Sequence, residues 1–287
     1  HFFDTETKHM FAIAIAVVLA GVIQVIWSLF ALRRVGWFSS DTSKVRGELR
    51  KLMRTTLPMI VGLGVLQINT LCDGLIASWP TLFGDTIFGV TYPLQESAMS
   101  ELSFGQRLYQ FPLGVFGIAI ATAIYPLLSK QYQDDAGFSE TMRRGMRWVM
   151  FIGLPASAGL ILIREPLAAA VFQGGAFTSE DTLAVGEILL GYAPAVWAFS
   201  MCGVLTKGFY ARGNTMIPVK VAIGCMVLNA ALNVTLIWTP LHTAGLAWST
   251  SICAVLQAAL LMALISKEAR PFNGKVFVSW LKASLLT

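Results

Sequence analysis

The sequence predicts an all-α polytopic membrane protein with about seven full transmembrane helices and a truncated eighth. Of its 287 residues, 55% are hydrophobic and only 13% are charged, whereas soluble globular chains carry about 25% charged residues. The mean hydropathy is +0.66. Apolar runs of about 20 residues, the length that crosses a bilayer, recur along the chain and predict the individual helices.

The apolar runs place the helices in order along the chain. Full spans are expected at residues 10–32, 55–79, 100–129, 148–172, 183–210, 218–238 and 246–265, with a further one beginning over 276–286. The connections over 80–101 and 131–146 are polar, and Thr178 or Ser179 is expected to cap the fifth span. The sequence Arg164-Glu165-Pro166 is expected to interrupt the fourth span near its end.

Positive charges are distributed unevenly between the two alternate sets of loops. One set holds 18 of the 21 Lys and Arg residues, and the other holds Lys8 and Arg164. Because cytoplasmic loops are rich in Lys and Arg, the first span is predicted to run from outside to inside. The net charge of +5 is thus an orientation signal, which argues against nucleic acid as a partner.

Enzyme and metal signatures are missing from the sequence. The four cysteines lie in apolar runs without a CxxC pair, so we expect core residues rather than a disulfide framework or a metal site. No nucleotide-binding loop, Ser–His–Asp set or paired carboxylates stand out, and we predict neither catalytic residues nor an organic cofactor. Residue 1 is His and the last residues are apolar, so we expect part of a longer chain.

Arg107 is the first candidate functional residue, because it lies within the third apolar span. An arginine at bilayer depth costs roughly 2.5–3.5 kcal/mol on insertion scales, and it normally faces protein or a water-filled cavity. Its planar guanidinium suits phosphate, to which it donates paired hydrogen bonds. The alternative is a snorkelling side chain that reaches the membrane interface.

Asp73 is the second charged residue expected inside the membrane. Asn69 lies on the same helical face, four residues earlier, and Gln67 lies to the side. Asp73 is either a hydrogen-bonded carboxyl at a helix contact or a site for a proton or cation. Asn229 and Asn233 repeat this spacing on the sixth span, where amides usually join helices. If they face Asp73, its oxygens and theirs, with that of Ser249, form a candidate Na⁺ site.

Several segments closely resemble the MviN/MurJ family of lipid II flippases, which belongs to the multidrug, oligosaccharidyl-lipid and polysaccharide exporters. The run RLYQFPLGVFGIAIAT is specific to that family, and the resemblance covers essentially the whole chain. The matching segments are GLGVLQINTLCDGLIAS (62–78), FGQRLYQFPLGVFGIAIATAIYPLLSK (104–130), LAAAVFQGGAFTSEDT (167–182), GFYARGNTMIPVKVAI (208–223) and HTAGLAWSTSICAVLQAALL (242–261).

The resemblance implies a two-lobe transporter fold of fourteen helices around a central cavity. Residues 1–36 would be the last helix of the N-terminal lobe, 37–54 a basic cytoplasmic connector, 55–270 the C-terminal lobe and 271–287 the start of a truncated further helix. Arg107 falls where the family carries a cavity arginine that contacts the lipid-linked pyrophosphate. Gln67, Asn69 and Asp73 match its polar seventh-helix motif, whereas some members have an acidic residue near Asn233.

The expected function is flipping of lipid II across a bacterial inner membrane by alternating access, with Arg107, Gln67 and Asn69 as substrate-binding residues. Asp73, Asn229, Asn233 and Ser249 would form an ion-coupling site for Na⁺ or H⁺. Expected partners are lipid II or a similar polyprenyl-diphosphate saccharide, membrane lipids and proteins of cell-wall synthesis. The alternatives are an exporter of another lipid-linked oligosaccharide or of drugs, and a non-transporting scaffold.

Overall fold

The computed structural model describes residues 5–34, 45–87 and 89–268, without the side chains of residues 5–10, 45–52 and several positions between 54 and 66. The chain divides into two units, His1–Arg54 and Thr55–Thr287. The first unit contains α1 (Thr5–Arg34), and α2 (Val45–Ala77) runs from the first unit into the second. Helix α2 therefore begins before the start predicted at residue 55.

A short helix and a hairpin connect α2 to the next long helix. They are α3 (Trp79–Phe83), β1 (Thr86–Ile87) and β2 (Val90–Thr91), and the strands pair antiparallel with Thr86 opposite Thr91. Gly89 in the turn has φ +82°, a conformation that glycine adopts without steric cost. The predicted polar connection over 80–101 thus has more regular structure than its composition indicated.

The helix that carries Arg107 changes its winding in the middle. It comprises α4 (Ala98–Pro112), a π-helical segment η1 (Leu113–Ile118) and α5 (Ala119–Lys130). Proline lacks the N–H that a regular helix needs, and the wider turns of η1 begin directly after Pro112. Such π-helical turns inside a helix are frequent at functional sites.

The following helix begins earlier than its apolar run indicated. Helix α6 (Asp135–Leu162) includes most of the polar stretch over 131–146, because that stretch is amphipathic: Phe138, Met142 and Met146 are buried at a spacing of four residues. The chain then breaks at Ile163 and continues as α7 (Arg164–Phe172), in agreement with the interruption predicted at Arg164.

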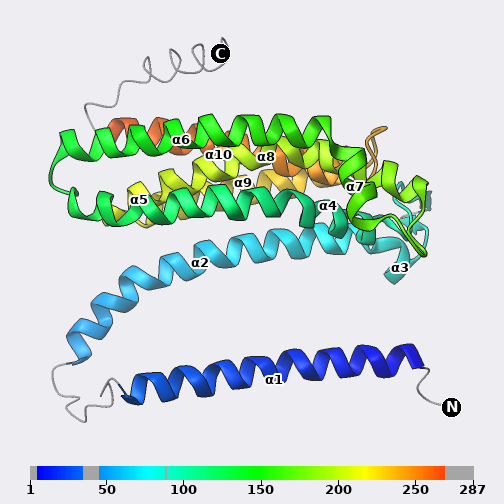
Figure 1. Ribbon diagram of the computed structural model, residues 1–287, viewed down its shortest axis with the longest axis horizontal. Helices are drawn as coiled ribbons and strands as arrows, with labels where there is room; N and C mark the ends of the chain where they lie inside the picture. Colours follow the sequence, from blue (N-terminus) through cyan, green and yellow to red (C-terminus); the bar gives the residue numbers. More distant parts are fainter. Residues whose placement is uncertain (1–4, 35–44, 88, 269–287) are drawn as a thin grey trace. The chain divides into compact units, whose positions relative to one another are not determined.

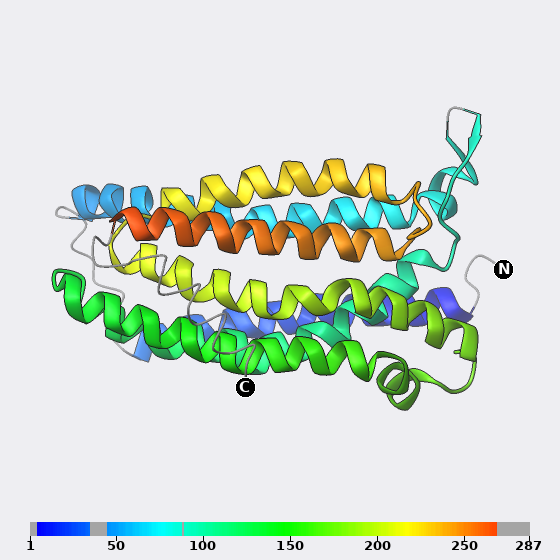
Figure 2. The same cartoon turned by 90° about the horizontal axis from the view of Figure 1, so that it is seen from above.

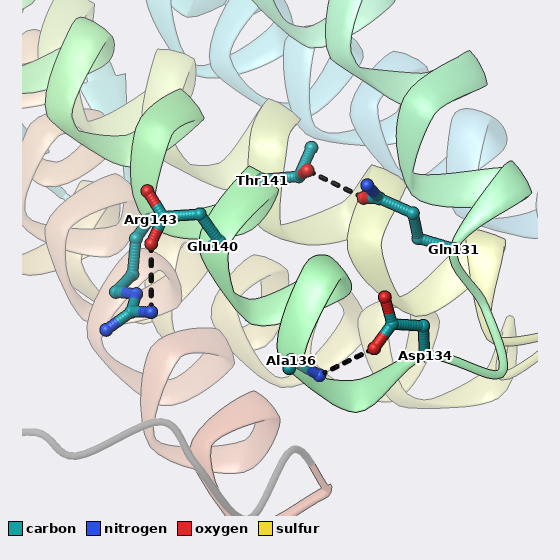
Figure 3. A network of polar contacts seen from close by, with 6 residues as sticks. All are labelled: Gln131, Asp134, Ala136, Glu140, Thr141 and Arg143. Carbon is teal, nitrogen blue, oxygen red and sulfur yellow. Dashed lines mark hydrogen bonds and ion pairs between the residues drawn. The ribbon is translucent and has the colours of Figure 1, made fainter.

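A hydrogen-bonded turn joins α5 to α6 at one end of the second unit (Figure 3). The carboxylate of Asp134 accepts a hydrogen bond from the backbone N–H of Ala136 at 3.1 Å and caps α6. Thr141 Oγ1 donates to the side-chain oxygen of Gln131 at 2.6 Å. An ion pair of 2.9 Å between Arg143 and Glu140 lies on the adjacent turn.

Three further helices complete the second unit: α8 (Ser179–Ala211), α9 (Met216–Leu236) and α10 (Ala244–Glu268). Thr178 caps α8 and exchanges hydrogen bonds with Asp181, so the predicted cap is confirmed. Helix α8 is buried along most of its length and packs against α4, α5, α6, α7 and α10. These helices lie side by side as one bundle (Figures 1 and 2), and the all-α fold class is confirmed.

Six helices of the part that the structure describes are long and apolar enough to cross a membrane. They are Phe11–Arg34, Ala98–Lys130, Asp135–Leu162, Ser179–Ala211, Met216–Leu236 and Ala244–Ser266. Helix α2 is not among the six, and the eighth segment predicted over 276–286 lies outside the described residues. The predicted number of spans therefore stays a prediction.

One end of the second unit carries several basic residues. The α5–α6 and α8–α9 turns lie at one end, and α3, the hairpin and the α9–α10 turn lie at the other (Figure 2). The first end carries Lys130, Arg143 and Arg144 close to its α5–α6 turn and Arg212 at its α8–α9 turn. Arg212 forms an ion pair of 2.6 Å with Asp135 and lies 4.2 Å above the ring of Phe138.

Candidate functional site

The carboxylate of Asp73 is buried inside the helix bundle of the second unit, where only 3% of the residue is exposed. Its Oδ1 accepts a hydrogen bond of 2.5 Å from Nδ2 of Asn233 on α9. Its Oδ2 accepts a longer one, 3.4 Å, from Nδ2 of Asn69, one turn earlier on α2. Burying a charged group is costly unless it is paired and hydrogen-bonded, so these amides stabilise the carboxylate and join α2 to α9.

Asn233 links the carboxylate to two more side chains. Its Nδ2 also donates to Oδ1 of Asn229 at 3.0 Å, and its Oδ1 accepts from the hydroxyl of Ser249 on α10. Asn229 Nδ2 donates to Ser249 Oγ at 3.3 Å. The structure therefore brings together all four residues of the predicted ion-coupling set, with Asn69 as a fifth member. We call these five residues the Asp73 cluster.

The donor set of the Asp73 cluster can be compared with the needs of Na⁺, which binds oxygen ligands. Asp73, Asn229, Asn233 and Ser249 each supply a side-chain oxygen, from three different helices. In the arrangement described here, the amide nitrogen of Asn233 lies between the oxygens of Asp73 and Asn229. A cation fits there only if the side-chain amide of Asn233 flips, so that its oxygen takes the place of its nitrogen. The two groups have nearly the same shape, so the flip needs little extra space.

A small cavity of about 40 Å³ adjoins the Asp73 cluster between α2, α8, α9 and α10. It has room for a few water molecules, each of which needs roughly 10–15 Å³ of such volume and two or more polar partners. Asn69 and Asn229 line it together with Thr250 and Gln257. The cluster thus borders a space that water or a small ion can enter.

Arg107 differs from Asp73 in its surroundings, because its side chain is exposed on α4. Its guanidinium lies 5.8 Å from the centre of the Phe104 ring, within the range of a cation–π contact. Among the described residues, no carboxylate forms an ion pair with it. An arginine whose hydrogen-bond donors are not used inside the protein is available to an anionic ligand.

Other polar residues share the face of α4 that carries Arg107. Ser103 lies one turn before it and Gln110 nearly one turn after it, and Gln110 is exposed. Gln67, the second residue predicted to bind substrate, is likewise exposed on α2. Asn69, the third, points to the Asp73 cluster instead, because residues two apart on a helix face different directions.

Sequence reasoning missed a second set of polar side chains, buried or partly buried between α4 and α8. Gln106 Nε2 donates a hydrogen bond of 3.1 Å to the hydroxyl of Tyr192. The rings of Tyr109 and Tyr192 stack with centroids 4.5 Å apart. The helical register of α4 predicts that Gln106 and Tyr109 lie near one face, but the partner on α8 is 86 positions away and no sequence pattern identifies it.

A larger cavity of about 370 Å³ opens at the end of the bundle that carries α3 and the hairpin. Glu101, Glu187 and His242 line it. It is separate from the Asp73 cluster, with which it shares no lining residue. Over the described residues, no group of three or more His, Cys, Asp or Glu side chains has the geometry of a metal site.

The fold is similar to those of solved membrane transporters. It matches a structure of the lipid II flippase MurJ in an inward closed conformation with a TM-score of 0.66 and 23% identity, over 84% of this chain and 47% of that one. A transporter of the MOP superfamily from Pyrococcus furiosus matches with a TM-score of 0.63 and 13% identity, over 81% of this chain and 50% of that one. The chain therefore shares the helical fold of these proteins, and six long apolar helices among the described residues indicate a multi-pass membrane protein.

Sequence comparison identifies the family. The family model "Lipid II flippase MurJ" matches residues 1–287. A probable lipid II flippase MurJ of Vibrio cholerae is 37% identical over 87% of this chain and 45% of its own length. One from Haemophilus influenzae is 31% identical over 96% of this chain and 52% of its own. The chain belongs to the lipid II flippase MurJ family, and it spans about half the length of these relatives.

Proposed function

We propose that this chain forms the C-terminal helix bundle and the preceding helix of a flippase that moves lipid II across the bacterial inner membrane. The observation that carries the proposal is Arg107, a cation on an apolar helix with no ion-pair partner among the described residues. Membership of the MurJ family supplies the substrate class. The activity is transport, with no catalytic step on the substrate.

Arg107 would bind the diphosphate of the lipid. A guanidinium donates parallel hydrogen bonds to phosphate oxygens, and each hydrogen bond to a charged group contributes about 1.5–3 kcal/mol. Gln67 would add an amide contact to the head group. The polyprenyl chain stays in the bilayer, since moving it through a polar cavity would expose its apolar surface.

Movement would follow the alternating-access scheme, in which two lobes rock about a site near the bilayer midplane. The proposed orientation places the basic end of the bundle, at the α5–α6 and α8–α9 turns, in the cytoplasm, and α3 with the hairpin outside. The bias of Lys and Arg toward alternate loops supports this orientation. The head group would then enter from the basic side and leave on the opposite side.

We further propose that Asp73 couples transport to H⁺ or Na⁺. Charged groups buried at membrane depth commonly mark ion or proton pathways, and the Asp73 cluster supplies oxygen ligands from three helices beside a cavity of about 40 Å³. Either ion would neutralise the carboxylate. If transport by an Asp73→Asn variant keeps the Na⁺ and pH dependence of the unmodified protein, this coupling role is wrong.

Complementation tests the transport proposal. Bacteria depleted of their own lipid II flippase would receive a full-length protein containing this chain, with Arg107 or with Arg107→Ala. We expect the first to restore growth and the second to fail at equal membrane expression. Arg144→Ala is the matched control, because it removes an exposed arginine from α6 and should leave growth intact.

Each of the other outcomes of the complementation experiment would contradict part of the proposal. Growth with Arg107→Ala would reduce this arginine to a snorkelling side chain and remove the main support for head-group binding. Failure of the unmodified protein, at normal expression, would favour export of another lipid-linked oligosaccharide or a scaffold role. A drug-resistance assay on the same strains would identify a drug exporter.

A further inference from the structure

Buried contacts connect the Asp73 cluster to α8. Ser249 of the cluster lies on α10, and Ala247 and Ser251, two residues before and after it, both approach Gly191 on α8. The hydroxyl of Ser251 donates to the carbonyl oxygen of Gly191 at 2.5 Å. A Cβ atom on Gly191 would lie 2.8 Å from that of Ala247, so the two backbones approach closely here. A displacement of α10 at Ser249 would therefore be transmitted to α8 at Gly191.

The next residue, Tyr192, carries the contact from α8 to α4. It is 1% exposed, accepts the hydrogen bond from Gln106 and stacks on Tyr109 with an angle of 22° between the rings. The helices are also close at Gly105, where a Cβ atom would lie 2.6 Å from a methyl carbon of Ile188. Protein interiors of this density transmit small displacements instead of absorbing them.

Gln106 and Arg107 are consecutive on α4 and point in different directions. Successive side chains on a helix are about 100° apart, which places Gln106 toward α8 while Arg107 is exposed. Because the backbone of α4 joins them, a shift or rotation at Gln106 repositions Arg107. These contacts thus connect the cluster to α4 through Ser251, Gly191 and Tyr192, and the backbone of α4 joins Gln106 to Arg107.

We infer that Gln106 and Tyr192 are positioning residues that couple the state of the Asp73 cluster to anion binding at Arg107. The inference rests on the proposed function, in which Arg107 binds the diphosphate and Asp73 receives the ion. When Asp73 changes state, the Tyr192–Gln106 hydrogen bond moves α4 and with it the guanidinium. Coupling of this kind is a free energy between two sites and can be measured as one.

A double-mutant cycle on the purified full-length protein tests this, with lipid II in detergent micelles as the ligand. We expect Asp73→Asn and Tyr192→Phe each to weaken binding about three- to tenfold, and the double variant to bind no more weakly than the poorer single one. Gln106→Met removes the same hydrogen bond from the other side. Combined with Tyr192→Phe, it should add nothing.

Tyr125→Phe provides the matched control, because Tyr125 lies on α5 beside Lys207, away from these contacts. The fold-changes in lipid II affinity caused by Tyr125→Phe and Asp73→Asn should therefore multiply in the double variant. The coupling is overturned if the fold-changes of Tyr192→Phe and Gln106→Met also multiply with that of Asp73→Asn. It is equally overturned if neither Tyr192→Phe nor Gln106→Met changes the affinity. If Arg107→Ala also leaves the affinity unchanged, the proposed function itself fails, whereas a loss of affinity with Arg107→Ala alone leaves that function standing.

Discussion

The Asp73 cluster and the exposed face of α4 both place a charge within apolar helices, but they treat it in opposite ways. Asp73 is 3% exposed and accepts hydrogen bonds from amides on two helices. Arg107 is exposed, and its guanidinium lies 5.8 Å from the centre of the Phe104 ring. The hydrogen bonds of Asp73 join α2 to α9. Arg107 has no ion-pair partner in the part of the chain that the structure describes, so its charge is open to an anionic ligand.

The largest expected difference is in binding of the lipid diphosphate. Arg107→Ala should weaken lipid II binding roughly ten- to hundredfold, since it removes hydrogen bonds to a charged group worth about 1.5–3 kcal/mol. Thermal stability should stay unchanged, because the side chain is exposed. Arg107→Lys should recover part of the affinity, since a lysine keeps the charge but loses the paired donors. A fall in stability with intact binding would place Arg107 among the structural charges.

Removal of the buried charge should instead change stability. Asp73→Ala leaves donors of Asn233 and Asn69 without their acceptor, which costs about 1–3 kcal/mol. Thermal unfolding in detergent should show a lower midpoint than for Asp85→Ala, which alters an exposed carboxylate of the hairpin connection. Equal midpoints for the two variants would mean that the cluster does not hold α2 to α9.

Substitution of two glycines in η1 tests how tightly the segment that follows Arg107 packs against α8. A Cβ atom on Gly117 would lie 2.3 Å from Oγ of Ser200 on α8, whereas one on Gly114 would meet nothing within 4 Å. Gly117→Ala should therefore destabilise the protein by about 1–2 kcal/mol through overpacking. Gly114→Ala should have little effect. If both variants behave alike in thermal unfolding, η1 does not pack against α8 as described.

The smallest effect is expected at the N-terminus of α8, away from both the Asp73 cluster and Arg107. Thr178→Ala removes the capping box with Asp181 and should cost about 1 kcal/mol. Ser179→Ala, one position further, removes an exposed hydrogen bond from Gln173 and should cost less. These two variants calibrate what an ordinary polar contact contributes in this protein. A loss for Thr178→Ala as large as that for Asp73→Ala would remove the special status of the cluster.

Residues of the Asp73 cluster could be grouped from the sequence only within each helix. The spacing of four residues places Asn69 beside Asp73, and Asn229 beside Asn233, because it matches one helical turn. That the two pairs face each other depends on how α2 packs against α9. The candidate Na⁺ site requires this meeting, and the hydrogen bond between Asn233 and Asp73 provides it. Asn69, which we had grouped with Arg107, lies with Asp73 for the same reason.

Local sequence determined the helical class, the break before Arg164, the cap at Thr178 and the segregation of basic residues. Each of these depends on neighbouring residues or on composition, through hydropathy, proline, capping and charge. Tertiary structure alone decided that Tyr192 contacts Gln106, that Gly191 lies against Ala247 and that Asp73 is bonded while Arg107 is exposed. These features depend on which helices pack together and at what rotation, and apolar surfaces that all favour burial specify neither.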